Sequence, residues 1–373
     1  MRGSIENMQN RKIKIIVLFV EPMLYGMDLI REVYEKTPYE FQYIYCEEKV
    51  TGRDEIQLPV NAVLFKGNAY QRKRLLKKIF QDFQPDFAII NGYVGYEQTI
   101  AIKYCQKWHI PYSIETDTPL HIPESKFKAI LKKVYLKKLL HHECCYGFPG
   151  GTLQKENLVY YGIPDNKCYI MPMSISEKRL IKECKKVENQ AELKNEYNVS
   201  ERKVILFVGR LEPEKNVSLL IHSFGELKKL DNEVVLFIIG DGSERKKLEQ
   251  LAEELKIEDI YFEGYITFPK NVIYYKMADI FVLPSEYEPW GLVVNEAIIM
   301  GLPVVVSSHV GCREDLIQNG KNGYIFENND REDLTRCLQQ TLNLEIEFRM
   351  TDQWNYKQYL EGFKRAVESI CRK

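Results

Sequence analysis

Residues 279–297 read DIFVLPSEYEPWGLVVNEA. The apolar run at 279–283 is typical of a buried parallel strand, and the following turn, rich in Pro and Gly, leads into a helix. Ligands bind at the carboxyl ends of the strands in such sheets, where the free N–H groups of a helix start attract phosphate. Glu288 and Glu296 stand just before and just inside this helix start. Because carboxylates beside a phosphate site can hold sugar hydroxyls, the stretch predicts a nucleotide-sugar site.

Short apolar runs alternate with helical patterns along the whole chain, which is typical of parallel, doubly wound α/β sheets. In the first half, strands are expected at 13–20, 42–46, 61–66, 86–90, 111–115, 145–148 and 168–172. In the second half, strands are expected at 203–208, 234–239, 259–263, 279–283, 303–306 and 323–326. Each series is long enough for a Rossmann-like domain, and a cleft between two such domains is a preferred place for a ligand.

The length of 373 residues also favours two domains. We expect the first domain at 1–176 and the second at 177–352, with the lysine- and glutamate-rich stretch 176–201 forming the link and a helix. Residues 353–373 are amphipathic, and no strand follows them. They are expected to form a C-terminal helix that packs back toward the first domain.

The composition, with 45% hydrophobic and 28% charged residues, is that of a soluble globular protein. The net charge of −1 gives no reason to expect a nucleic-acid partner. Residues 1–176 carry 24 Lys and Arg against 19 Asp and Glu, whereas residues 177–373 carry 28 against 34. The basic first half therefore hints at an anionic partner.

The nine cysteines show no metal-ligand spacing and are expected to be reduced thiols. The apolar run at 15–20 is too short to cross a bilayer, and it starts too late and lacks the cleavage site of a signal peptide. These observations favour a cytoplasmic location.

Three more segments of the second half follow expected strands, at 207–216, 239–243 and 307–315. In the first of them, Arg210 and Lys215 place two cations at a strand's carboxyl end, where Arg can grip a diphosphate with two parallel bonds. Such charges are also common as ordinary solvated groups. The Gly-x-Gly of the second segment is weak evidence, because a tight turn explains it equally well.

Together these segments resemble the donor half of the retaining glycosyltransferases of group 1, family GT4, which have the GT-B fold. The resemblance covers residues 203–330 and rests on Gly-Arg-Leu and Glu-Lys within 209–215, the two glutamates, and Gly-Leu-Pro-Val-Val at 301–305. It implies two Rossmann-like domains that face a central cleft, the first binding the acceptor and the second the donor, with a C-terminal helix crossing back.

The resemblance also implies roles for individual residues. Arg210 and Lys215 would neutralise the donor diphosphate, while Glu288 would contact the transferred sugar and Glu296 the ribose. The donor-binding set so implied is Gly209, Arg210, Lys215, Gly240, Glu288, Trp290, Gly291, Leu292 and Glu296. The catalytic set is Asp117, Arg210, Lys215 and Glu288. Acidic residues are also common at helix starts without any binding role, which is the alternative explanation of Glu288 and Glu296.

The first half resembles the family less closely. Where many members have a Gly-Gly loop after the first strand, this chain has only Gly26. Where many have a His-Asp pair, residues 115–119 read ETDTP, with Asp117 in the place of the histidine. Gly26, Asp117 and Thr118 are the candidates on the acceptor side, with Asp117 as an acid or base. Asp117 and Thr118 are equally typical of a turn and cap before a proline.

The implied reaction is sugar transfer from a nucleoside-diphosphate donor to a hydroxyl, with retention at the anomeric carbon. The acceptor implied is a growing cell-surface polysaccharide or a lipid-linked sugar. No metal or other cofactor is expected, since no Asp-x-Asp motif stands beside the site. The alternatives are an inactive partner subunit that binds donor without transfer, and a nucleotide-sugar 2-epimerase. A nicotinamide dehydrogenase is disfavoured, because no Gly-x-Gly-x-x-Gly follows the first strand.

Residues 126–140, KFKAILKKVYLKKLL, form a basic amphipathic stretch. Six lysines surround apolar positions at helical spacing, which are 127, 130, 131, 134, 135 and 139. The pattern fits a helix that contacts an anionic membrane, which would place the protein at the inner face of the cell membrane. It also fits a helix whose apolar side packs on the domain's own sheet while its lysines are solvated.

Overall fold

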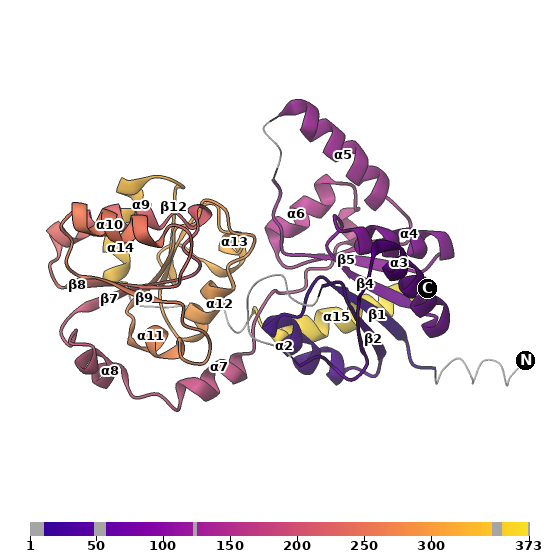
Figure 1. Cartoon of the computed structure of the whole chain (residues 1–373), viewed down its shortest axis with the longest axis horizontal. Coiled ribbons are helices and arrows are strands. Elements are labelled where there is room, and N and C mark those ends of the chain that lie inside the picture. The colour runs from indigo at the N-terminus through magenta and orange to yellow at the C-terminus, as the bar shows by residue number, and fades with distance from the viewer. Residues whose placement is uncertain (1–10, 48–56, 122–124, 345–352, 372–373) are drawn as a thin grey trace, which may run out of the picture. The chain divides into compact units, whose positions relative to one another are not determined.

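The computed structural model describes residues 11–47, 57–121, 125–344 and 353–371. The chain folds as two compact units (Figure 1). Unit 1 consists of Met1–Met173 together with Tyr356–Lys373, and unit 2 of Ser174–Asn355. The boundaries thus lie a few residues from 176 and 353.

Unit 1 is built on a six-stranded sheet with the order β3-β2-β1-β4-β5-β6. All of its neighbouring strands pair in parallel. The strands are β1 (Lys14–Phe19), β2 (Glu40–Tyr45), β3 (Ala62–Leu64), β4 (Phe87–Asn91), β5 (Tyr112–Thr116) and β6 (Cys145–Pro149). The α-helices are α2 (Leu24–Glu32), α3 (Ala69–Phe83), α4 (Tyr96–Trp108), α5 (Lys126–Leu140), α6 (Thr152–Tyr160) and α15 (Tyr356–Cys371).

Unit 2 repeats this plan with the sheet order β12-β11-β10-β7-β8-β9, again all parallel. The strands are β7 (Lys203–Val208), β8 (Val234–Ile239), β9 (Ile260–Gly264), β10 (Ile280–Leu283), β11 (Val304–Ser307) and β12 (Gly323–Phe326). The α-helices are α7 (Glu177–Cys184), α8 (Gln190–Glu196), α9 (Val217–Leu230), α10 (Arg245–Glu254), α11 (Val272–Met277), α12 (Leu292–Ile299), α13 (Arg313–Leu316) and α14 (Arg331–Leu342).

Both sheets have the doubly wound order in which the first strand lies at the centre and the chain then crosses to its other side. The prediction of two Rossmann-like, parallel-sheet domains is therefore confirmed. The reversal occurs between β1 and β4 in unit 1, and between β7 and β10 in unit 2. These are the places where open α/β sheets bind ligands, at the carboxyl ends of the strands.

One expected strand, at 168–172, is wrong. The segment runs beside β6 and makes only an isolated bridge between Gly147 and Cys168. The Met171 N–H donates to the carbonyl of Pro149 at 2.9 Å, but Pro149 has no N–H with which to continue the ladder. The apolar composition that suggested a strand reflects burial instead, since Met171 is fully buried.

The C-terminal helix α15 completes the core of unit 1. Its residues at helical spacing enter the same buried cluster as β1 and β2, and these are Tyr356, Tyr359, Phe363, Ala366, Val367 and Ile370. The Tyr359 hydroxyl also donates to Glu115 at the end of β5, at 2.8 Å. Burial raises the pKa of Glu115, and this hydrogen bond opposes the rise.

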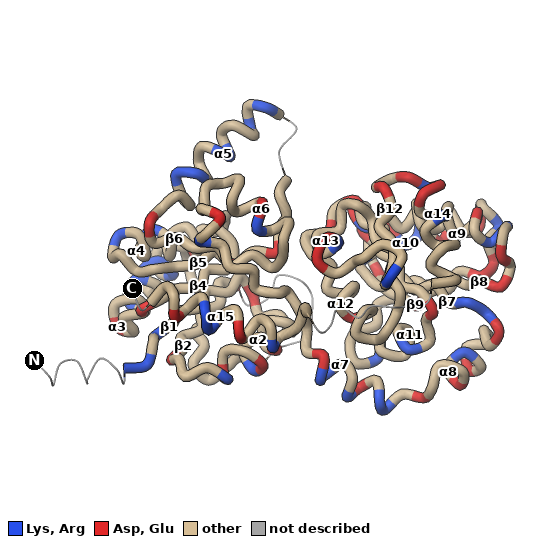
Figure 2. The backbone as a smooth tube through the Cα atoms, turned by 180° about the vertical axis from the view of Figure 1, so that it is seen from behind, with Lys and Arg blue, Asp and Glu red and all other residues tan. Residues whose placement is uncertain are grey.

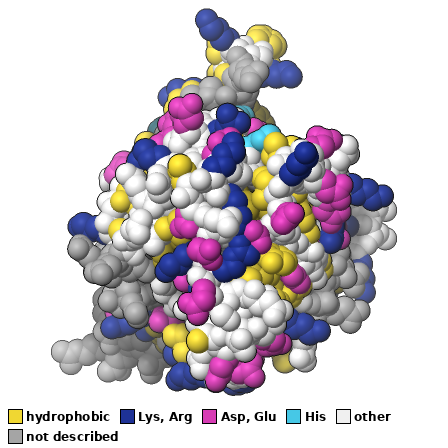
Figure 3. All heavy atoms as spheres, turned by 90° about the vertical axis from the view of Figure 1, so that its left-hand side faces the viewer, with side chains coloured by type: hydrophobic (Ala, Val, Ile, Leu, Met, Phe, Trp, Pro, Cys, Tyr) yellow, Lys and Arg dark blue, Asp and Glu magenta, His cyan; other side chains and the backbone are white. Residues whose placement is uncertain are grey.

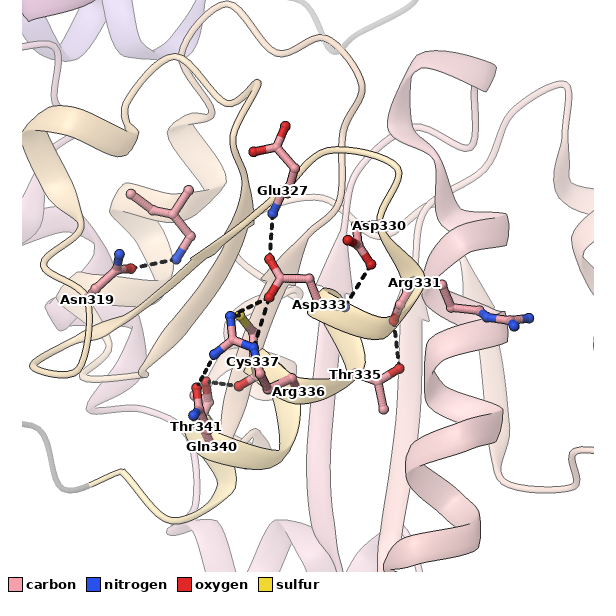
Figure 4. Close-up of polar contacts among 11 residues, drawn as sticks. Asn319, Glu327, Asp330, Arg331, Asp333, Thr335, Arg336, Cys337, Gln340 and Thr341 are labelled. Atoms are coloured by element: carbon pink, nitrogen blue, oxygen red, sulfur yellow. Dashed lines mark hydrogen bonds and ion pairs between the residues drawn. The ribbon is translucent and has the colours of Figure 1, made fainter.

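The turn from β12 into α14 is held by a network of carboxylates (Figure 4). Asp330 caps α14 by accepting the Asp333 N–H at 2.9 Å. The Asp333 carboxylate in turn accepts the Glu327 N–H at 2.8 Å and pairs with Arg336. Burial alone would raise the pKa of Asp333, but the Glu327 N–H and the Arg336 guanidinium lower it. The last strand and helix of unit 2 are thereby fixed to each other.

A second carboxylate, Asp259, joins three elements of unit 2. It pairs with Arg202, before β7, and with Lys228 of α9, each at 2.5 Å. The hydrogen bond from Arg202, followed by the contacts with Lys228, lowers the pKa of Asp259 to about 2. A carboxylate whose pKa is lower in the folded than in the unfolded state stabilises the fold above its unfolded pKa, and this stability is lost as the pH falls toward the folded value.

We therefore expect Asp259→Asn to lower the unfolding free energy by about 1–2 kcal/mol at pH 7. The difference from wild type should shrink as the pH falls from about 4 to about 2, as the wild-type carboxyl becomes protonated. Urea unfolding across this range measures the effect. The neighbouring exposed residue Glu258 supplies the control, since Glu258→Gln should change little. An equal loss at all pH values would contradict the assignment.

Candidate functional site

Three loops meet at the carboxyl edge of the unit 2 sheet. We call residues 209–216 the β7 loop, residues 284–291 the β10 loop and residues 308–312 the β11 loop, each after the strand it follows. Strands β7 and β10 are paired neighbours at the point where the chain reverses direction. Open α/β sheets bind ligands at this point, beside the loops that follow the two strands.

The β7 and β10 loops are joined by both backbone and side chains. The Glu286 N–H donates to the carbonyl of Glu214 at 2.9 Å. Next to it, the Lys215 ammonium forms a direct ion pair with the Glu288 carboxylate. Only 12% of the Lys215 side chain and 13% of the Glu288 side chain are exposed. Lys215 and Glu288, two predicted site residues that are far apart in sequence, are thus in direct contact, and their opposite charges compensate each other.

The β11 loop holds the other side of the β10 loop. The Gly311 N–H donates to the carbonyl of Glu288 at 2.9 Å, and the Cys312 N–H donates to that of Trp290 at 3.1 Å. The Ser307 hydroxyl also donates to the carbonyl of Ser285 at 2.5 Å. Glu288 is therefore fixed through its main chain on one side and its carboxylate on the other, which makes it a preorganised group.

Trp290 turns its side chain into the protein rather than toward a ligand. It is 1% exposed, stacks on Trp354 at 5.8 Å between ring centroids, and donates its indole N–H to Asn295 at 2.8 Å. Its part in a binding site is limited to its main chain. Gly291, which follows, has φ +98°, a conformation that favours glycine.

The helix start next to these residues has no side-chain cap. Gly291 is the N-cap of α12, which begins at Leu292, and as a glycine it provides no side-chain cap for the first turn. The N–H groups and dipole at this end of the helix can therefore act on an anion.

Arg210 and Glu296 lie outside the Lys215–Glu288 contact. Arg210 is largely exposed, with 62% of its side chain accessible, and pairs with Glu214 at 3.3 Å. Glu296 is half-buried inside α12, where burial raises its pKa while Tyr275 and Arg179 oppose the rise. Arg210 is thus an exposed cation paired with Glu214, whereas Glu296 is half-buried within α12.

The predicted glycines bring loops together. Gly240 has φ +151°, and a Cβ there would lie 1.8 Å from the carbonyl oxygen of Gly209. A Cβ at Gly242 would lie 2.4 Å from the carbonyl oxygen of Leu211. The β7 loop and the loop after β8 therefore pack backbone to backbone. The tight-turn interpretation of the Gly-x-Gly segment accounts for these contacts without a ligand.

The unit 1 candidates have different surroundings. Gly26 lies in the first turn of α2 and is buried, so no glycine loop follows β1. Asp117 follows β5 and accepts a hydrogen bond from the Thr118 hydroxyl at 3.3 Å. Burial raises its pKa. Gln154 and Asn157 of α6 donate to the carbonyls of Asp117 and Thr118, at 3.1 and 2.9 Å, so this turn is held in place.

Sequence reasoning missed several residues that support these positions. Glu214 links the two central loops through its carbonyl, and Asn295 fixes Trp290. Asn295 had a readable signal, since it is a polar residue within the apolar run of α12. In unit 1, His109, Glu143 and Cys144 place three potential ligand atoms within 4.8 Å of one another, two of the residues being exposed and the third intermediate. Glu143 and Cys144 are adjacent, but His109 is distant from them in sequence, which hid the grouping.

The segment of unit 2 that holds this site matches a known protein family. Residues 189–359, which include all three loops, match the profile of a family described as "Glycosyl transferases group 1". This part of the chain belongs to the group 1 glycosyltransferases. The predicted similarity to group 1 is therefore confirmed for the segment that holds the Lys215–Glu288 pair.

Similar proteins agree with this group 1 assignment. An uncharacterized glycosyltransferase of Haemophilus influenzae is 28% identical over 249 residues, which are 64% of this chain and 69% of that protein. The alpha-monoglucosyldiacylglycerol synthase of Streptococcus pneumoniae is 33% identical over 122 residues, or 32% of this chain. That match spans only 28% of the synthase.

A solved structure shows that the fold extends over both units. The Anabaena protein HepE, in complex with UDP, aligns with 96% of this chain and 100% of its own, with a TM-score of 0.75 and 15% identity. The predicted GT-B fold is therefore confirmed.

Proposed function

We propose that this group 1 glycosyltransferase is a retaining enzyme of family GT4 that uses a nucleoside-diphosphate sugar as donor. The observation that carries the proposal is the Lys215–Glu288 contact at the point where the unit 2 sheet reverses direction. It places a cation for phosphate and an acceptor for sugar hydroxyls next to each other. A diphosphate with an attached sugar needs this combination.

The donor diphosphate would lie between Lys215 and the start of α12. Its charge would compete with Glu288 for the Lys215 ammonium, which frees the carboxylate to accept hydrogen bonds from the sugar. Arg210, whose guanidinium is exposed, would close on the diphosphate with two parallel bonds. Glu296, set deeper in α12, is the candidate for the ribose hydroxyls.

The reaction breaks the bond between the anomeric carbon and a diphosphate oxygen, and forms one between that carbon and the acceptor oxygen. Negative charge develops on the departing diphosphate, so Lys215, Arg210 and the helix start act where stabilisation is worth most. The acceptor oxygen attacks on the face from which the diphosphate leaves, which gives retention. Asp117, with its raised pKa, is the candidate in unit 1 for handling the acceptor's proton.

For the acceptor we propose a hydroxyl of a cell-surface polysaccharide or of a lipid-linked sugar. The S. pneumoniae relative, which is named as a synthase of a glucosylated diacylglycerol, supports the lipid-linked alternative. In this proposal unit 2 binds the donor and unit 1 binds the acceptor, as in the family that the sequence resembles.

The test is a thermal-shift screen with nucleotides and nucleotide sugars, followed by product analysis with the best donor. A ligand present at about 100 times its Kd adds about 2.7 kcal/mol of stability, which is readily seen as a rise in Tm. We expect stabilisation by a nucleoside diphosphate, and a product whose anomeric configuration, read by NMR, matches the donor. Binding without transfer would indicate an inactive subunit, and turnover of the donor without any acceptor would indicate an epimerase.

A further inference from the structure

Helix α5 is attached to unit 1 by one face of its C-terminal half. Leu136, Leu139 and Leu140 enter the core cluster of the unit. Beside them, the Lys133 ammonium lies 3.9 Å from the ring centre of Tyr160, at the end of α6. The rest of α5 extends away from the sheet (Figure 1). The helix therefore has a docked end and a projecting end.

A second apolar face of α5 is exposed. Successive helical residues are turned by about 100°, which places five apolar residues on one stripe roughly 140° wide, opposite the three docked leucines. The exposed fractions are 70% for Phe127, 62% for Ile130, 53% for Leu131, 63% for Val134 and 55% for Tyr135. We call these five residues the α5 stripe. The sequence-level alternative, in which all apolar positions pack on the unit's own sheet, is wrong for the stripe.

Lysines border the α5 stripe on both sides. The same helical geometry places Lys126, Lys133 and Lys137 along one border, and Lys128 and Lys132 along the other. Lys138 continues the stripe beyond its C-terminal end. The helix has no acidic residue. Figure 2 shows these basic positions along α5, and the top of Figure 3 shows hydrophobic and basic side chains adjoining there.

This pattern favours one kind of partner. An apolar stripe with lysines on both borders matches a lipid surface, where the stripe enters the acyl boundary and the lysine stems reach up to anionic headgroups. A second copy of the helix would bring six like charges against six, which opposes self-pairing. No described helix is long and apolar enough to cross a membrane.

We infer that α5 is a membrane-surface helix, which inserts the α5 stripe into the interface of an anionic leaflet and holds unit 1 there. The inference rests on the geometry of α5 alone and goes beyond the proposed transfer reaction. If both are correct, the acceptor is met at the membrane surface.

Co-sedimentation with vesicles tests the inference. The intact protein should bind vesicles of phosphatidylcholine mixed with phosphatidylglycerol at least 10-fold more strongly than vesicles of phosphatidylcholine alone, and high salt should weaken this binding. The stripe variant Ile130→Gln with Val134→Gln should lose at least 10-fold in binding to the anionic vesicles. The charge variant Lys126→Gln, Lys128→Gln and Lys137→Gln should do the same. Both leave the docked leucines in place, so their thermal unfolding should match wild type.

A matched control removes the same charge from unit 2, through Lys246→Gln, Lys247→Gln and Lys256→Gln, and should bind vesicles as wild type does. The inference is overturned if the intact protein fails to bind anionic vesicles, or if the stripe variant binds them as well as wild type. It is also overturned if the protein self-associates without vesicles and the stripe variant abolishes this. Donor-induced stabilisation should be equal in all variants, so a failure of the donor assignment is seen separately.

Discussion

Lys215→Ala is expected to reduce kcat/KM for the nucleotide sugar by about 100- to 1000-fold, the loss typical of removing one preorganised group that stabilises transition-state charge. The variant loses the ammonium that would meet the departing diphosphate. Steady-state kinetics with the donor identified by thermal shift measures the effect. The reduction should appear mainly in kcat, because the charge on the leaving group grows in the transition state.

A structural explanation of this loss can be separated from a catalytic one. Lys215→Ala also leaves the mostly buried Glu288 carboxylate unpaired, which costs about 3–5 kcal/mol when a buried pair loses one partner. The double variant Lys215→Met with Glu288→Leu removes both charges and should recover most of the stability. Its activity should stay at or below that of Lys215→Ala. If activity returned together with stability, the pair would have a structural role only.

Gly240→Ala is expected to destabilise unit 2 by about 3 kcal/mol or more, through a left-handed conformation and an overlap that cannot relax. The added Cβ would lie 1.8 Å from the backbone oxygen of Gly209, so the β7 loop must move. Urea unfolding measures the loss of stability. Donor binding should weaken as well, because Arg210 and Lys215 are on the displaced loop.

Gly301 provides the matched control for this variant. It also has a positive φ, of +84°, but a Cβ there would meet nothing within 4 Å. Gly301→Ala should therefore cost only the conformational part, about 1–2 kcal/mol. Equal losses in the two variants would mean that the approach of the loops to each other has no part in stability.

The strand pattern was predictable because the central strands of each sheet, such as β8 and β10, are buried on both faces and leave a continuous apolar run in the sequence. The failure at 168–172 shows the limit of this signal. Met171 is apolar because it is buried, but pairing depends on backbone N–H groups, and Pro149 on the neighbouring strand lacks one. Apolar composition reports burial, whereas a ladder needs donors on both strands.

The candidate site was predictable to the extent that its chemistry is local. Lys215 and Glu288 follow recognisable strands, and sheet topology brings their loops together. The inward turn of Trp290 was not predictable, since it depends on Trp354, which is distant in sequence. It was also not predictable that α5 has one buried and one exposed apolar face, because the periodicity of a helix does not indicate which face the fold buries. The donor, acceptor and catalytic roles stay predictions.

The place of α15 in unit 1 has a consequence for biosynthesis. When the ribosome has synthesised the chain up to residue 355, all of unit 2 has been made. Unit 1 still lacks α15, the helix that supplies Tyr359 and Phe363 to its core. The first 173 residues are therefore made early, and the apolar face of their sheet that α15 covers stays exposed while residues 174–355 are synthesised. Unit 2 can complete its fold during translation, and unit 1 becomes complete only when residues 356–371 follow.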